Sequence, residues 1–176
     1  IPLMFAREEK LRALAEASDL NFIENGSDRR VGFITSGPAY MHVKESFPNA
    51  PVLKLGLSFP VPFEKCRELA ALVEQVVVVE EVEPLVETEL KAIGVKVIGK
   101  EILPRQGELS PNVLRPAVAR LLGEPMPEVQ STAALQVFPR PPTMCVACPH
   151  LGVYYTLSQV RNISIAGDIG CYTLGA

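Results

Sequence analysis

Val76-Val77-Val78-Val79 is a run of four valines with no polar residue among them. A strand that is covered on one face alternates apolar and polar residues, whereas a strand buried on both faces is apolar throughout. The run therefore predicts a strand in the middle of a parallel sheet, with helices packed against both faces.

Outward from the valines, the same unit of strand and helix recurs. Shorter apolar runs occupy residues 31–35, 52–55 and 95–98, and each is bounded by turn-forming residues. Because strands that alternate with helices pair in parallel through right-handed crossovers, the pattern predicts a three-layer α/β domain with a parallel sheet.

Proline and glycine mark the ends of the expected helices. Pro38 is suited to open a helix that continues to Phe47, and a second helix is expected at residues 63–73. Pro84 precedes a third helical pattern, which Gly94 would close in the usual capping place. These positions fit helices that lie between consecutive strands.

A fourth helical pattern runs from Ser110 to Gly123, with apolar residues spaced as on one helical face. Pro116 stands inside it, where proline loses a backbone hydrogen bond and clashes with the preceding turn. We therefore expect this helix to restart at Pro116.

The chain divides by composition into four parts. We expect a helical connector from a preceding domain, with an amphipathic helix and a turn, then the α/β domain, a proline-rich linker and the beginning of a second α/β unit. Their bounds are 1–28, 29–123, 124–142 and 143–176. Both ends of the chain, at Ile1 and after the glycine-rich turn before Ala176, are expected to be cuts in a longer protein.

Charge and hydropathy exclude two classes of partner. The net charge is -3 with 21% charged residues, and no basic stripe of the kind that follows nucleic-acid phosphates is present. No apolar run reaches the roughly 18 to 20 residues that cross a bilayer, and the first residues lack the pattern of a secretion signal. We expect a cytoplasmic protein that binds neither nucleic acid nor membrane.

Two of the four cysteines form the motif Cys145-x-x-Cys148, which serves zinc, iron-sulfur clusters and dithiol exchange alike. Haem attachment is excluded because Pro149 separates Cys148 from His150. Cys171 is a candidate third metal ligand, although a buried apolar role is the alternative. The fourth ligand is either absent or lies downstream of this sequence. Cys66 falls on the apolar face of a helix and is expected in the core.

The second unit is expected to hold a helix at residues 151–159 and a buried strand at 163–166, followed by the turn Gly167-Asp168-Ile169-Gly170. Small residues after a parallel strand let backbone N–H groups approach a diphosphate, and Asp168 could bind its Mg²⁺. A bare turn is the alternative. His150 could either cap its own helix or point toward the same pocket.

Two weaker patterns lie in the first domain. Glu80, Glu81 and Glu83 follow the valine strand, where they could include a general base, but acidic residues are also favoured at helix N-termini, and we take the second interpretation. Ser36-Gly37, at the turn after residues 31–35, could cradle an anion.

Taken together, these segments resemble the large (alpha) subunit of the indolepyruvate:ferredoxin oxidoreductases, a family of thiamine-diphosphate-dependent 2-oxoacid:ferredoxin oxidoreductases. The most specific matches are Cys145-Val146-Ala147-Cys148-Pro149-His150 and Gly167-Asp168-Ile169-Gly170-Cys171-Tyr172-Thr173, which look like the start of the thiamine-diphosphate-binding domain. The preceding segments are similar to the transketolase C-terminal-like domain of that subunit: Gly32-Phe33-Ile34-Thr35-Ser36-Gly37, Lys54-Leu55-Gly56, Val79-Glu80-Glu81 and Gly107-Glu108-Leu109.

The resemblance implies oxidative decarboxylation of aryl 2-oxo acids to acyl-coenzyme A, with ferredoxin as electron acceptor. It implies an oligomer with the smaller beta subunit, and a chain that is inactive alone. The implied cofactors are thiamine diphosphate with Mg²⁺ and a [4Fe-4S] cluster. Cys145, Cys148 and Cys171 would hold the cluster, and the implied cofactor-binding residues are His150, Gly167, Asp168, Gly170, Cys171, Tyr172 and Thr173.

Two alternatives to this function remain open. A sister enzyme that acts on pyruvate or another 2-oxo acid would carry the same motifs. A non-catalytic module, in which the cysteines hold zinc for structure or for docking to another subunit, would need only the thiols.

Overall fold

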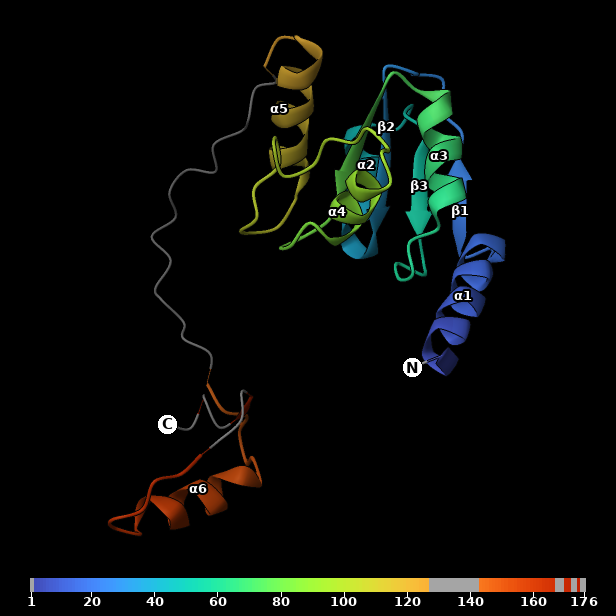
Figure 1. Cartoon of the computed structure of the whole chain (residues 1–176). Helices are drawn as coiled ribbons and strands as arrows, with labels where there is room; N and C mark the ends of the chain where they lie inside the picture. Colours follow the sequence, from blue (N-terminus) through green and yellow to red (C-terminus); the bar gives the residue numbers. More distant parts are fainter. Residues whose placement is uncertain (1, 127–142, 167–169, 172–173, 175–176) are drawn as a thin grey trace. The chain divides into compact units, whose positions relative to one another are not determined.

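The computed structural model describes residues 2–126, 143–166, 170–171 and 174 (Figure 1). The chain falls into two compact units, Ile1–Val129 and Gln130–Ala176. Residues 127–142, which include most of the expected linker, lie outside the described part. Among the described residues, no helix combines the length and the apolar character needed to span a bilayer.

The first unit is built on a four-stranded sheet in the order β1-β3-β2-β4. Strands β2, β3 and β4 are parallel to one another, and β1 runs antiparallel to β3. The bounds are Asn21–Glu24 for β1, Val31–Ser36 for β2, Val52–Leu55 for β3 and Gln75–Val79 for β4.

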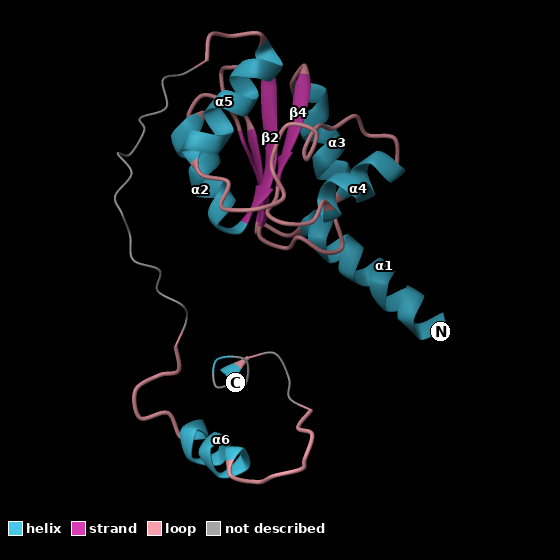
Figure 2. Ribbon diagram, turned by 90° about the vertical axis from the view of Figure 1, so that its left-hand side faces the viewer, coloured by secondary structure: helices cyan, strands magenta, loops and turns pink. Residues whose placement is uncertain are grey.

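Helices cover both faces of this sheet, so the domain has three layers (Figure 2). Helices α2 (Gly37–Ser46) and α5 (Pro111–Leu122) pack on one face, in a core that includes Phe33. Helices α3 (Phe63–Leu72) and α4 (Leu85–Ala92) pack on the other face, in a core that includes Leu53. The expected three-layer α/β arrangement is confirmed.

The valine run supplies both cores. Val77 and Val79 belong to the core under α2 and α5, whereas Val76 and Val78 belong to the core under α3 and α4. All four are at most 4% exposed. Successive side chains of a strand point to opposite faces, so a strand between two helical layers needs an apolar residue at every position.

The prediction of a purely parallel sheet is wrong at its edge, where the expected connector contributes β1. This strand pairs antiparallel with β3, from Asn21 opposite Leu55 to Glu24 opposite Val52. Asn21 is fully buried; its Nδ2 donates to the carbonyls of Ala15 (3.0 Å) and Leu57 (3.1 Å), and its Oδ1 accepts the Leu57 N–H (2.8 Å). A buried amide that is satisfied by backbone groups allows a polar residue inside the sheet.

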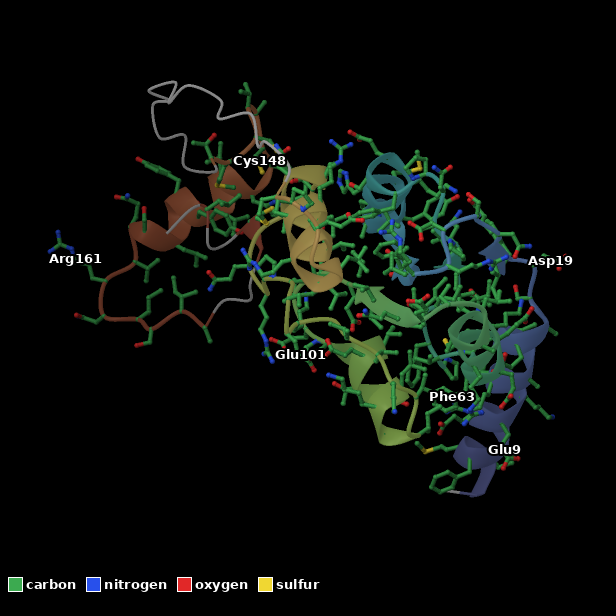
Figure 3. All side chains as sticks on the ribbon, turned by 90° about the horizontal axis from the view of Figure 1, so that it is seen from above. Glu9, Asp19, Phe63, Glu101, Cys148 and Arg161 are labelled. Atoms are coloured by element: carbon green, nitrogen blue, oxygen red, sulfur yellow. The ribbon has the colours of Figure 1, made fainter. Side chains whose placement is uncertain are left out.

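Helix α1, the amphipathic helix expected in the connector, spans Pro2–Ala17. Its C-terminal part contacts α3: the guanidinium of Arg12 lies 4.5 Å from the centre of the Phe63 ring, and Glu16 accepts the Glu64 N–H at 2.9 Å. Figure 3 labels Phe63 at this junction. The contacts tie the end of α1 to the sheet domain.

Two expectations for the end of this domain are wrong. Residues 95–98 make only a single parallel bridge, between Val77 and Ile98, because the chain turns back immediately afterwards through bonds from the Ile102 and Leu103 N–H groups to the Gly99 carbonyl. Helix α5 also continues through Pro116 without a restart. Proline costs that helix one bond, to the carbonyl of the exposed residue Asn112, which water can satisfy.

The second unit contains α6, His150–Ser158, within one residue of the expected helix. Residues 163–166 form no strand, and Ile163 and Ile165 are 48% and 41% exposed. A strand needs a neighbour for its backbone hydrogen bonds, and the described part of this unit contains no other strand. The prediction of a buried strand here is therefore wrong.

Candidate metal and cofactor site

The motif around Cys145 and Cys148 is a tight turn that brings its two ends together. The Cys148 N–H donates to the Cys145 carbonyl at 3.2 Å, and Ala147 adopts a left-handed φ of 58°. Val146, at the tip, is 99% exposed. Cys145 is exposed, Cys148 is half-buried, and both are free thiols. The turn thus presents two thiols that are accessible to a metal or an oxidant.

His150 is the first residue of α6 and lies beside the second thiol. Its Nδ1 is 3.5 Å from Cys148 Sγ, and its ring stacks on that of Tyr154 with centroids 6.1 Å apart. The helix has no side-chain cap. The imidazole therefore lies beside Cys148, which Figure 3 labels, and does not cap its own helix; the other expected role of His150, at the pocket of the turn at residues 167–170, stays a prediction.

Cys171 is exposed and follows Gly170, whose φ is 147°. The other residues of the expected cofactor turn lie outside the described residues: Gly167, Asp168, Tyr172 and Thr173. Within the described ranges, no group of three or more His, Cys, Asp or Glu side chains is placed to hold a metal ion. The convergence of three sulfurs on one metal therefore stays a prediction.

Cys66 is the remaining cysteine, and it is fully buried on α3. Desolvation, reinforced by the charge of Glu16, raises the pKa of Cys66 to about 12. The expectation that it belongs to the core is confirmed. The chain can consequently offer at most three thiolates to a cluster, and their chemistry fits iron or zinc, but a four-cysteine cluster needs one further ligand.

Two of the three acidic residues after β4, Glu80 and Glu83, have structural roles of the kind that the sequence indicated. Both carboxylate oxygens of Glu80 accept backbone N–H groups at the start of α4, from Val86 and Glu87 at 2.9 Å each. Glu83 pairs with Arg105 at 3.1 Å. Glu80 therefore stabilises the positive end of α4 and is not placed as a free general base.

Glu87 is a buried charge that sequence reasoning missed. Its side chain receives Lys91 Nζ at 2.7 Å and the Lys100 N–H at 2.8 Å. Burial raises the pKa of Glu87, but these hydrogen bonds outweigh burial and hold the pKa below its ordinary value. The spacing of Glu87 and Lys91, four residues apart on one helix, is the signal that could have found this pair.

Comparisons with known proteins agree with the motifs. The chain is 34% identical over 194 residues to indolepyruvate oxidoreductase subunit IorA of Pyrococcus horikoshii, and 36% identical over 187 residues to IorA of Pyrococcus abyssi. IorA of Methanothermobacter thermautotrophicus is 35% identical over 188 residues. These alignments cover 95–99% of the chain. No family model matches.

A solved 2-oxoglutarate:ferredoxin oxidoreductase from Magnetococcus marinus aligns with 56% of the chain and 19% of its own, at 21% identity and a TM-score of 0.47. The chain spans about 30% of the length of the curated relatives it matches. The resemblance carried by the cysteine and glycine motifs is confirmed: over nearly its whole length, the chain is homologous to a stretch of the indolepyruvate oxidoreductase subunit IorA.

Proposed function

We propose that the chain is part of the alpha subunit of an oxidoreductase that oxidatively decarboxylates aryl 2-oxo acids, of the indolepyruvate type, to acyl-coenzyme A with ferredoxin as acceptor. The support is the 34–36% identity to IorA subunits, which extends over 95–99% of the chain. It therefore includes both the sheet domain and the thiol-bearing turn. A cytoplasmic assembly with a smaller beta subunit belongs to the same proposal.

The thiol-bearing turn is proposed as part of an iron-sulfur site, with Cys145, Cys148 and Cys171 as three ligands of a [4Fe-4S] cluster. The observation that carries this role is the turn itself, which closes through the Cys148 N–H and exposes two free thiols. When bound, the cluster would supply one-electron transfer toward ferredoxin. In this proposal His150, whose Nδ1 is 3.5 Å from Cys148 Sγ, donates a hydrogen bond to that sulfur.

The turn from Gly167 to Thr173 is proposed to bind thiamine diphosphate and its Mg²⁺. Gly167, Asp168, Gly170, Cys171, Tyr172 and Thr173 are the residues involved, and thiamine diphosphate would supply the electron sink for loss of CO₂. Glycine at positions 167 and 170 lets the backbone N–H groups approach a diphosphate closely, and Asp168 would contribute a carboxylate oxygen to the metal.

One observation favours a second candidate, a structural zinc site without catalysis. Sulfur and imidazole nitrogen are the ligands that zinc prefers, and Cys148 Sγ and His150 Nδ1 are close enough to share one ion. In that case Cys145, Cys148 and His150 would fasten the start of α6, and the unit would act in docking.

Activity of the whole enzyme tests the proposed function. The full-length alpha subunit with its smaller partner is assayed with indolepyruvate, coenzyme A and ferredoxin, and with pyruvate or 2-oxoglutarate in place of indolepyruvate. We expect indolepyruvate to give the largest kcat/KM. Cys148→Ser should abolish ferredoxin reduction, because it removes a cluster ligand.

Cys66→Ala is the matched control, since it removes a thiol that is buried in the sheet domain. We expect its kcat to stay close to that of the parent. Preference for pyruvate would refute the aryl substrate, and full ferredoxin reduction by the Cys148→Ser enzyme would refute the role of the turn in electron transfer.

A further inference from the structure

The two thiols of the turn at Cys145 and Cys148 are close enough to bond to each other as well as to a metal ion. The Cys148 N–H donates to the Cys145 carbonyl at 3.2 Å, which closes a turn of four residues. Such turns hold their first and last Cα atoms within about 7 Å, and disulfides join Cα atoms that are about 4.4 to 6.8 Å apart. The backbone of the turn is therefore already suited to a disulfide.

The tip of the turn is free to adjust when such a bond closes. Ala147 has a φ of 58°, and a left-handed residue at this position lets the chain reverse direction between the two cysteines. Val146, beside it, is 99% exposed. Because the Val146 side chain packs against nothing, a small change in the torsion angles of the turn displaces no core contact there.

The two sulfurs differ in their access to an oxidant. Cys145 is exposed, whereas Cys148 is half-buried and its Sγ lies 3.5 Å from Nδ1 of His150. Cysteines that respond to oxidants are accessible and often lie next to a second, resolving cysteine. An oxidant therefore reaches Cys145 first, and Cys148 is the neighbouring thiol that can resolve the product.

The other two cysteines are less suited to this bond. Cys66 is fully buried on α3, where an oxidant in solution does not reach it. Cys171 is exposed, but within the described ranges no three His, Cys, Asp or Glu side chains gather at one point, so it does not complete the pair. Closing a loop costs more entropy as the loop lengthens. The bond between Cys145 and Cys148 is consequently the favoured product.

We propose that Cys145 and Cys148 form a reversible disulfide when the turn carries no cluster, and that this bond controls whether a cluster can be loaded. The inference rests on the proposed cluster role of the turn. Metals are bound by the thiolate form of cysteine, so the disulfide withdraws two of the three proposed ligands together. It also halts oxidation of the exposed thiols at a stage that a reductant reverses, before sulfinic acid forms.

The oxidant is a peroxide, and one molecule is consumed for each disulfide. Cys145 Sγ attacks one peroxide oxygen, the O–O bond breaks, and the departing oxygen leaves as water with the thiol proton, so that Cys145 becomes a sulfenic acid. Cys148 Sγ then attacks the Cys145 sulfur, the S–O bond breaks, and the hydroxyl group leaves as a second water with the Cys148 proton. A dithiol reductant returns two electrons and two protons and restores both thiols.

Tryptic mapping of the full-length subunit tests the disulfide. A chelator first removes any metal in the absence of oxygen, and an equimolar amount of hydrogen peroxide is then added. Residues 121–161 form a single tryptic peptide, because Arg140 precedes Pro141, and it contains no cysteine besides Cys145 and Cys148. We expect this peptide to lose a pair of hydrogen atoms and to resist alkylation until a dithiol is added. Thiols that stay alkylatable, sulfinic acid in this peptide, or a link to another peptide would overturn the proposal.

Two variants identify the bonded pair. Cys145→Ser should leave Cys148 without its partner, so that the protection from alkylation is lost. Cys171→Ser is the matched control, because it removes the other exposed thiol, and the disulfide should form in it as in the parent. Loss of the disulfide in Cys171→Ser, or its persistence in Cys145→Ser, would refute the assignment.

Iron uptake tests the control of cluster loading. The oxidised subunit, supplied with iron and sulfide, should take up no iron until a dithiol is added, whereas the reduced subunit should take up both. Equal uptake by the two forms would refute the proposed control. Failure of the reduced subunit to take up iron would refute the cluster role under the proposed function, and the mapping result distinguishes the two failures because it needs no cluster.

Discussion

Phe33→Ala is expected to lower the free energy of unfolding of the sheet domain by about 3 to 5 kcal/mol. Phe33 is fully buried in β2, between Val52 of β3 and Val77 of β4, and its ring stacks on Phe47 with centroids 4.7 Å apart. Truncation removes this burial and leaves a cavity that rigid strands on both sides prevent from closing. Domains are stable by about 5 to 15 kcal/mol, so the variant should lose a large part of its stability.

Urea unfolding followed by far-ultraviolet circular dichroism measures this loss. Phe59→Ala is the control, because Phe59 is 61% exposed and its truncation should change the free energy of unfolding by less than about 0.5 kcal/mol. Equal midpoints for the two variants would show that Phe33 does not lie at the centre of the core.

Asn21→Ala is expected to destabilise the same domain by about 2 to 4 kcal/mol. The amide bonds three backbone groups, the carbonyls of Ala15 and Leu57 and the N–H of Leu57, and it joins the end of α1 to the segment after β3. Alanine would leave these groups without a partner inside the protein, and each unsatisfied buried group costs about 1 to 3 kcal/mol when water cannot reach it.

Asn112→Ala is the matched control, since Asn112 is exposed on α5. We expect thermal and urea unfolding to distinguish the two variants clearly, with Asn112→Ala close to the parent. If both variants unfold together with the parent protein, the amide of Asn21 does not hold β1 and α1 in place.

The central strands could be predicted from sequence because burial on two faces leaves a local mark. Val76 to Val79, like Val52 to Leu55, is apolar at nearly every position, and the observed strands include these runs. The helices follow from the spacing of their apolar residues, as at Cys66 and Leu69 on α3. The sequence pattern was sufficient to predict a strand or helix wherever the buried side chains recur with the period of that element.

The edge of the sheet could not be predicted in this way. Strand β1 has four residues and begins with the polar Asn21, whose burial depends on carbonyl groups as distant as Leu57. Its antiparallel direction comes from its pairing with β3, in which Glu24 lies opposite Val52, 28 residues further along the chain. A pairing at this distance leaves no local signal in the sequence. Residues 163–166 illustrate the converse, because an apolar run without a neighbouring strand does not form one.

The chemistry of the residues at the candidate sites could be predicted from the sequence, but the arrangement of their side chains could not. Cys145 and Cys148 could be assigned to metal or redox chemistry from their spacing, whereas the direction of His150 depends on the turn before α6. After β4, Glu80 and Glu81 are adjacent and identical in type. Only the fold shows that it is Glu80 whose carboxylate bonds to the start of α4.

Metal analysis of the full-length subunit, purified without oxygen, tests the central claim most directly. Iron, acid-labile sulfide and zinc are measured per polypeptide in the parent and in the Cys148→Ser and Cys66→Ala variants. A cluster at the turn predicts that Cys148→Ser loses iron and sulfide in equal amounts while Cys66→Ala retains both. Unchanged iron in Cys148→Ser, or a loss of zinc in place of iron, would contradict an electron-transfer role for this turn.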